Sequence, residues 1–187
     1  SAASTWTLEF HMALSLYDAS IPGYLGMLKN LAAILDKAEA HAKANGVDPQ
    51  TYLAARLAPD MHPLTNQIQI ASDAAKGGAA RLAGVTPPSM PDTETTWAEV
   101  KDRVAKTIAF LETITREQIE AQDEARIIEL PTPNRTLKFT AKDFLFQFSL
   151  PNFHFHVVTA YGLLRSQGVP IGKLDYLAAG QPQLLAA

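Results

Sequence analysis

The apolar residues of this chain recur at intervals of three and four over four long stretches, which is the spacing that places them on one face of a helix. The stretches cover residues 21–45, 61–83, 97–114 and 141–166. The inner positions of the second stretch are rich in alanine. We therefore expect this helix to approach a neighbouring helix closely.

Residues that cap helices mark several of the expected boundaries. Ser20 is the expected N-cap of the first helix, unless an earlier turn begins the helix and kinks at Pro22. Asp60 is the expected cap of the second helix. Thr96 and Glu99 have the spacing of a capping box, in which each side chain bonds the other's backbone N–H, and they open the third helix.

The periodicity changes between the third and the last helix. Residues 126–130 and 136–140 alternate in hydrophobicity and are separated by a proline-containing turn, which predicts a small β-hairpin. Thr140 then caps the last helix. Residues 85–92 hold three prolines and form an extended linker that crosses from one end of the fold to the other. The pattern predicts an all-α four-helix bundle with a hairpin before its last long helix.

The length, the net charge and the absence of cysteine limit the classes of protein to which this chain can belong. The chain has 187 residues, a formal net charge of -3 and no cysteine. Residues 1–11 resemble an expression-vector remnant, which leaves residues 12–187 as one expected domain. The charge excludes nucleic acid as a principal partner, and no apolar run is long enough to span a membrane. Without cysteine and without a secretory signal, we expect a cytoplasmic protein.

The last helix carries more apolar side chains than one buried face requires. Aromatic and aliphatic residues occur on nearly every side of residues 144–164. The surplus predicts a second contact surface, most simply that of a twofold-symmetric homodimer. Alternatively, the hairpin and the tail from Leu174 to Leu185 cover these side chains.

Histidines are the candidates for chemistry, because the common catalytic motifs are absent. Asn152 and His156 lie one helical turn apart and share a face, whereas His154 points elsewhere. We expect His156 to point inward, either as a ligand or as a neutral core residue bonded to a backbone carbonyl, to Tyr17, to Tyr24 or to another neighbour. Pro151 leaves one helical carbonyl unpaired, so the helix is expected to bend there. The bend either opens a cavity or simply wraps the helix around the core.

Several strings of the chain resemble an uncharacterised family of small bacterial and fungal proteins that is grouped with the DinB/YfiT-like metalloenzymes. The resemblance covers the chain from about Ala13 to Tyr176. It rests on the strings LSLYDAS (14–20), LAPDM (57–61), LPNF (150–153), FH (155–156) and TAY (159–161).

This resemblance implies a four-helix bundle with a crossover, often dimeric, and a divalent metal such as zinc or nickel held by three histidines. Known relatives include isomerases and transferases that use low-molecular-weight thiols. His62 matches the first ligand position and His156 the last, whereas Asn152 stands where the family has its middle histidine. An amide oxygen would hold the metal more loosely than a third imidazole.

Two functional hypotheses follow. The first is a metal-dependent, thiol-using transferase or isomerase, with His62, Asn152 and His156 as ligands. The second is a non-catalytic dimeric bundle that binds a small apolar molecule between its helices, with Tyr17, Tyr24, Asn152 and His156 as polar anchors.

Overall fold

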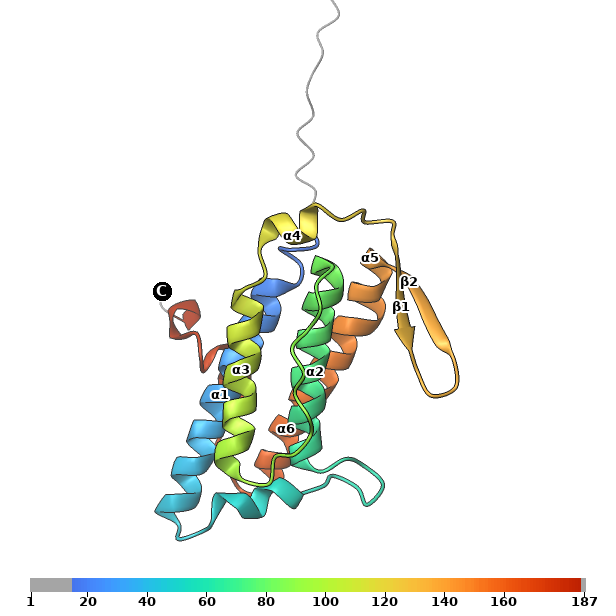
Figure 1. The fold of residues 1–187 in the computed structure, drawn as a ribbon. Helices are drawn as coiled ribbons and strands as arrows, with labels where there is room; N and C mark the ends of the chain where they lie inside the picture. The colour runs from blue at the N-terminus through green and yellow to red at the C-terminus, as the bar shows by residue number, and fades with distance from the viewer. Residues whose placement is uncertain (1–14, 186–187) are drawn as a thin grey trace, which may run out of the picture.

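The computed structural model of the protein describes residues 15–185, so the segment 1–11 lies outside the described residues. Four long helices lie side by side and confirm the predicted all-α bundle (Figure 1). They are α1 (Ile21–Ala44), α2 (Leu64–Ala83), α3 (Trp97–Glu112) and α6 (Leu150–Ser166). No helix within residues 15–185 combines the length and the hydropathy that crossing a bilayer requires.

Shorter elements connect the long helices. A 3₁₀ helix, η1 (Pro49–Ala54), joins α1 to α2, and α4 (Arg116–Glu120) follows α3. The predicted hairpin is present as β1 (Ile127–Pro131) paired antiparallel with β2 (Thr136–Thr140). The last part of the chain forms α5 (Ala141–Asp143), the π-helical segment η2 (Phe144–Ser149), α7 (Lys173–Ala178) and the 3₁₀ helix η3 (Pro182–Leu185).

The predicted crossover is the proline-rich linker between α2 and α3. Figure 1 shows α2 and α3 running in the same direction, with the linker returning along the full length of the bundle between them. Proline removes backbone donors and disfavours helix, so this segment stays extended. The linker therefore lies against the two helices that it joins.

Most of the predicted helix ends are confirmed. Thr96 and Glu99 form the capping box of α3, and Gly84 ends α2 in the left-handed conformation with φ 69°. Ser20 precedes α1, but its hydroxyl donates to the carbonyl of Leu16, 2.5 Å away, instead of capping the helix.

The prediction that Asp60 caps the second helix is wrong. Helix α2 begins at Leu64, and the residue at its N-cap position is Pro63. A proline disfavours helical geometry in the residue before it, so His62 is excluded from the helix and the first turn starts after Pro63. His62 accordingly lies before the helix and not in its first turn.

The missing backbone donor at Pro151 is accommodated by a change of helix type. Residues 144–149 form a π-helical segment, and the N–H of Leu150 donates to the carbonyl of Leu145, five residues earlier. The helix then continues as α6 to Ser166. A π-helical turn inserts extra backbone into the helix and turns the side chains before Pro151 to new directions.

The core is tightest where α1, α2 and the last helix meet. Tyr24 is fully buried, and its ring meets the ring of Phe153 edge-on at 5.1 Å between centroids. Gly78 lets α2 come close, because a Cβ at that position would lie 2.5 Å from the Oγ of Ser149 and 2.7 Å from the hydroxyl oxygen of Tyr24. The close approach expected from the small residues of α2 is therefore confirmed.

Part of the aromatic surplus of the last helix is packed within the chain. Phe139 of β2 contacts Phe144 and Phe148, with ring centroids 6.2 and 5.7 Å away. Phe155 remains 55% exposed and Val158 48% exposed. The C-terminal tail packs on α1, where Asn30 bonds the backbone of Tyr176 and Gly180, and it covers part of the last helix, where Tyr176 lies beside Tyr161 and bonds His154, but it leaves Phe155 and Val158 exposed. Homodimerisation through α6 stays a prediction.

We expect Gly78→Ala to lower the free energy of unfolding by about 1–2 kcal/mol, because overpacking outweighs the gain in helix propensity. Gly23→Ala is the matched control, since a Cβ on this α1 glycine meets no atom within 4 Å. The free energy of unfolding of Gly23→Ala should equal or exceed that of the natural chain, because alanine favours helix more than glycine does. Urea unfolding of both variants measures the difference, and equal stabilities would contradict the close approach at Gly78.

Candidate functional site

A cavity of about 200 Å³ lies between α2 and the last helix, next to the hairpin. Its apolar walls come from α2, from β1 and from the π-helical segment. Its polar and charged positions are Asp73, Arg81, Ser149 and Asn152. The complete lining is Ile70, Asp73, Ala74, Gly78, Arg81, Leu130, Phe144, Phe148, Ser149 and Asn152.

A pair of hydroxyl groups stands at the inner side of this cavity. The hydroxyl of Tyr24 and the Oγ of Ser149 are 2.6 Å apart, and both side chains are buried. Burial raises the pKa of Tyr24 to about 12, against the opposing effect of the bond from Ser149. Tyr24 is therefore neutral near pH 7, and the pair shares one hydrogen bond, which leaves the other lone pairs of Ser149 for a further partner.

His156 is buried, as its position on the inner stripe predicted, and it bonds a residue that sequence reasoning missed. Its Nδ1 lies 2.6 Å from the Oε1 of Gln67 on α2. The Nε2 of Gln67 donates to the backbone carbonyl of His62 at 3.1 Å. A carbonyl can only accept, so the amide oxygen of Gln67 faces the imidazole, and His156 carries its proton on Nδ1.

The electrostatics at His156 favour the neutral imidazole. Burial lowers the pKa of His156, and the nearby charge of His62 lowers it further. The side chain of His62 itself is exposed, and only its backbone carbonyl takes part in the hydrogen-bond chain. His156 is therefore buried and bonded to a neighbour, as the second alternative for this residue expects, while its role as a ligand is a separate prediction.

The donor set does not fit the three-histidine metal site that the family resemblance implies. Within residues 15–185, no three histidine, aspartate or glutamate side chains are grouped so that they could hold a metal ion. The group that meets His156 is the neutral amide of Gln67, and Asn152 lines the cavity with Ser149. Zinc and nickel favour imidazole or thiolate ligands over amide oxygens. Metal ligation by His62, Asn152 and His156 stays a prediction.

The two tyrosines expected as ligand anchors lie in different places. Tyr24 does not line the cavity itself, but its hydroxyl bonds Ser149, which does. Tyr17 precedes α1, where the guanidinium of Arg116 lies 4.7 Å from its ring centroid, and it is not among the cavity residues. Asn152 is the one residue of this lining that the sequence hypotheses named; sequence reasoning missed the others, among them the polar and charged Asp73, Arg81 and Ser149.

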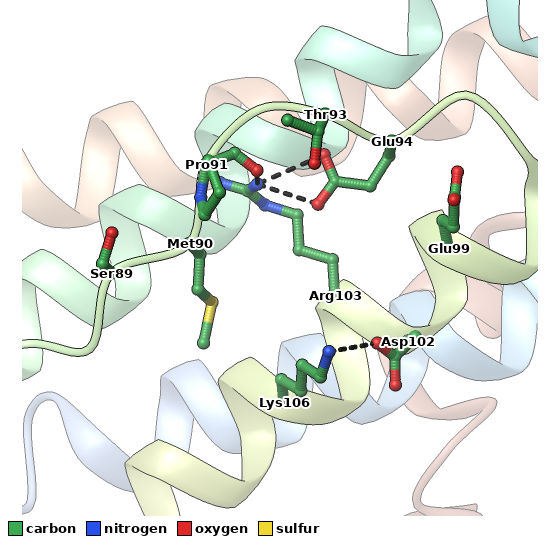
Figure 2. A pocket seen from close by; sticks show the side chains of 9 residues that line it. All are labelled: Ser89, Met90, Pro91, Thr93, Glu94, Glu99, Asp102, Arg103 and Lys106. Carbon is green, nitrogen blue, oxygen red and sulfur yellow. Dashed lines mark hydrogen bonds and ion pairs between the residues drawn. The ribbon is translucent and has the colours of Figure 1, made fainter.

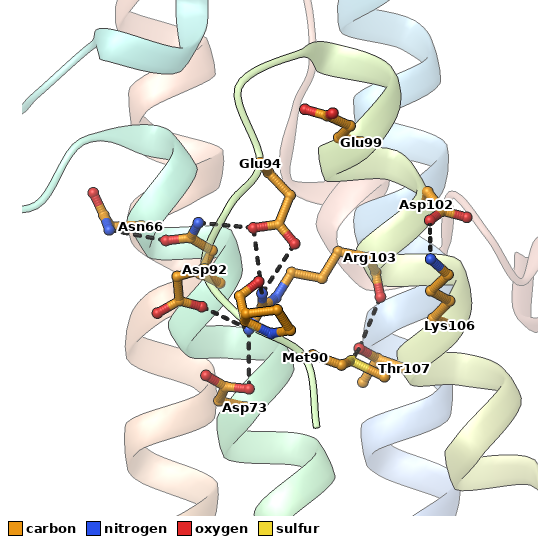
Figure 3. Close-up of polar contacts among 12 residues, drawn as sticks. Asn66, Asp73, Met90, Asp92, Glu94, Glu99, Asp102, Arg103, Lys106 and Thr107 are labelled. Atoms are coloured by element: carbon orange, nitrogen blue, oxygen red, sulfur yellow. Dashed lines mark hydrogen bonds and ion pairs between the residues drawn. The ribbon is translucent and has the colours of Figure 1, made fainter. Parts of the chain in front are cut away.

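A second hollow, of about 260 Å³, lies under the linker beside Arg103 (Figure 2). Arg103 extends from α3 and is 2% exposed. Its guanidinium bonds Asp73 of α2 and Asp92 and Glu94 of the linker, each at 3.0 Å (Figure 3). Three carboxylates thus surround one guanidinium, and Lys76 supplies a second positive charge at Asp73. The cluster therefore fastens the linker to the two helices.

Glu94 is the most enclosed of these carboxylates, at 11% side-chain exposure. Burial alone would raise its pKa. The hydrogen bonds from Gln69, at 2.8 Å, and from Arg103 outweigh that effect, so the pKa of Glu94 lies below its usual value. A carboxyl group whose pKa is lowered by folding stabilises the fold above its unfolded pKa, and this stability is lost as the pH falls through the folded pKa.

We expect Glu94→Gln to be about 1 kcal/mol less stable than the natural chain at pH 7, because it replaces charged hydrogen bonds with neutral ones. The difference should shrink as the pH falls through the lowered pKa of Glu94, because the carboxyl group then becomes neutral. Urea unfolding over a series of pH values from 7 downward measures the difference. Glu124→Gln, at an exposed position after α4, serves as control. A difference that does not change with pH would contradict the role of the charge.

Comparison with known proteins places this architecture in a family. Residues 16–177 match the model of a domain of unknown function, DUF1993. A crystal structure of a DinB family member protein from Shewanella denitrificans matches with a TM-score of 0.78 and 42% sequence identity, over 87% of this chain and 92% of that chain. No curated protein matches. The chain therefore belongs to the DUF1993 family, and its fold is that of a DinB family member.

Proposed function

We propose that this protein binds a small, largely apolar molecule in the cavity between α2 and the last helix. The observation that carries the proposal is an apolar cavity next to Asn152, with the hydroxyl pair of Tyr24 and Ser149 at its inner side. Ligand sites between helices typically combine apolar walls with a few placed polar groups.

Each part of the lining has a role in this proposal. The rings of Phe144 and Phe148 supply broad apolar surface, and Leu130 of the hairpin adds an aliphatic side chain. Ser149 offers a hydroxyl that is already oriented by Tyr24, which lowers the entropic cost of a hydrogen bond to the ligand. Asn152 offers both an amide donor and a carbonyl acceptor.

We expect benzyl alcohol to bind the purified protein, because its ring matches the aromatic walls and its hydroxyl matches Ser149. Ala74→Leu should reduce this affinity at least tenfold, since Ala74 lines the cavity and the larger side chain occupies part of it. Ala98→Leu is the matched control, on the exposed surface of α3. Isothermal titration calorimetry measures all three affinities.

Binding that survives in Ala74→Leu, or that is lost equally in Ala98→Leu, would contradict the cavity as the site. The first hypothesis, a thiol-dependent enzyme using zinc or nickel, has a separate test. Near-stoichiometric zinc uptake by the protein that is abolished in His156→Ala would favour that hypothesis over a non-catalytic binding protein.

A further inference from the structure

Arg81 stands out among the residues that line the cavity. It lies on α2, one turn after Gly77, and is half-buried. Its guanidinium lies against the helix backbone, where a Cβ at Gly77 would be 2.6 Å from its Nη1. Its guanidinium makes no ion pair or hydrogen bond to the residues in the range 15–185. A cation thus borders an apolar cavity without a compensating anion.

The carboxylate that lines the cavity and the carbonyls at the end of α2 have partners other than the guanidinium of Arg81. Asp73 lines the same cavity, but it bonds Lys76 at 2.9 Å and Arg103 at 3.0 Å. The backbone carbonyls of Arg81 and Leu82 accept hydrogen bonds from Arg126, at 3.1 and 2.6 Å. Asp73 therefore already has two cationic partners, Lys76 and Arg103, and the guanidinium of Arg81 is left without a partner within residues 15–185.

The chemistry of the cavity selects one class of anion. A guanidinium presents a planar fork of N–H donors that matches the two oxygens of a carboxylate. Arg81 is the single cation in the lining, whose remaining surface is mainly apolar, so a monoanion with an apolar body fits better than a phosphate dianion.

Resting on the function proposed above, we infer that the ligand is a small carboxylic acid with an apolar, ring-sized body. Arg81 binds its carboxylate, and the body lies between Phe144, Phe148 and the α2 wall. This specifies the ligand class and identifies Arg81 as the residue that determines it.

Benzoate and benzyl alcohol test this inference, because they share a ring and differ in the charged group. The protein should bind benzoate more tightly than benzyl alcohol, and added sodium chloride should weaken benzoate binding. Arg81→Gln should weaken benzoate binding at least tenfold and change benzyl alcohol binding less than twofold. Arg135→Gln, on the exposed hairpin loop, should leave both affinities unchanged.

The possible outcomes separate the two proposals. If both probes bind equally well and Arg81→Gln affects neither, the carboxylate inference is overturned while the cavity remains a binding site. If neither probe binds the natural chain, the proposed function fails and the inference fails with it. Circular dichroism of Arg81→Gln confirms that the variant is folded.

Discussion

The close approach of α2 to α1 and the last helix at Gly78 is the contact on which the rest of the structure depends. The absence of a side chain at Gly78 leaves room for the hydroxyls of Tyr24 and Ser149, which are 2.6 Å apart. The two buried hydroxyls share one hydrogen bond, which leaves the O–H of the accepting hydroxyl for a further partner. The cavity lies next to this contact, because both Gly78 and Ser149 are part of its lining.

The π-helical segment links a local backbone constraint to the shape of the site. Pro151 cannot donate a hydrogen bond, and the preceding turn widens from the α to the π pattern. The side chains of that turn include Phe144, Phe148 and Ser149, which form one wall of the cavity. A single proline thus acts on the binding surface through helix geometry, although its own side chain is not part of the lining.

Two arginines of this protein have different surroundings and different roles. Arg103 is buried, and three carboxylates hold it in place under the linker. Arg81 borders the cavity without an anionic partner among the described residues. Asp73 connects the two sites, because its bonds to Arg103 and Lys76 satisfy the one carboxylate that lines the cavity with Arg81. The ion pairs of Asp73 therefore affect two features of the protein: the attachment of the linker to the helices and the charge at the cavity.

Local chemistry determined the four helices, the hairpin and most helix ends, because caps, prolines and periodicity act within a few residues. The capping box at Thr96 is of this kind, and Asp60 failed as a cap because Pro63 sets the start of α2 more strongly. Periodicity also turned His156 inward. Its partner Gln67 is 89 positions away, so only helix packing could decide that contact and the cavity beside Asn152, which Arg81 borders without a partner among residues 15–185. Those features depend on distances between helices, which the order of residues along one helix does not specify.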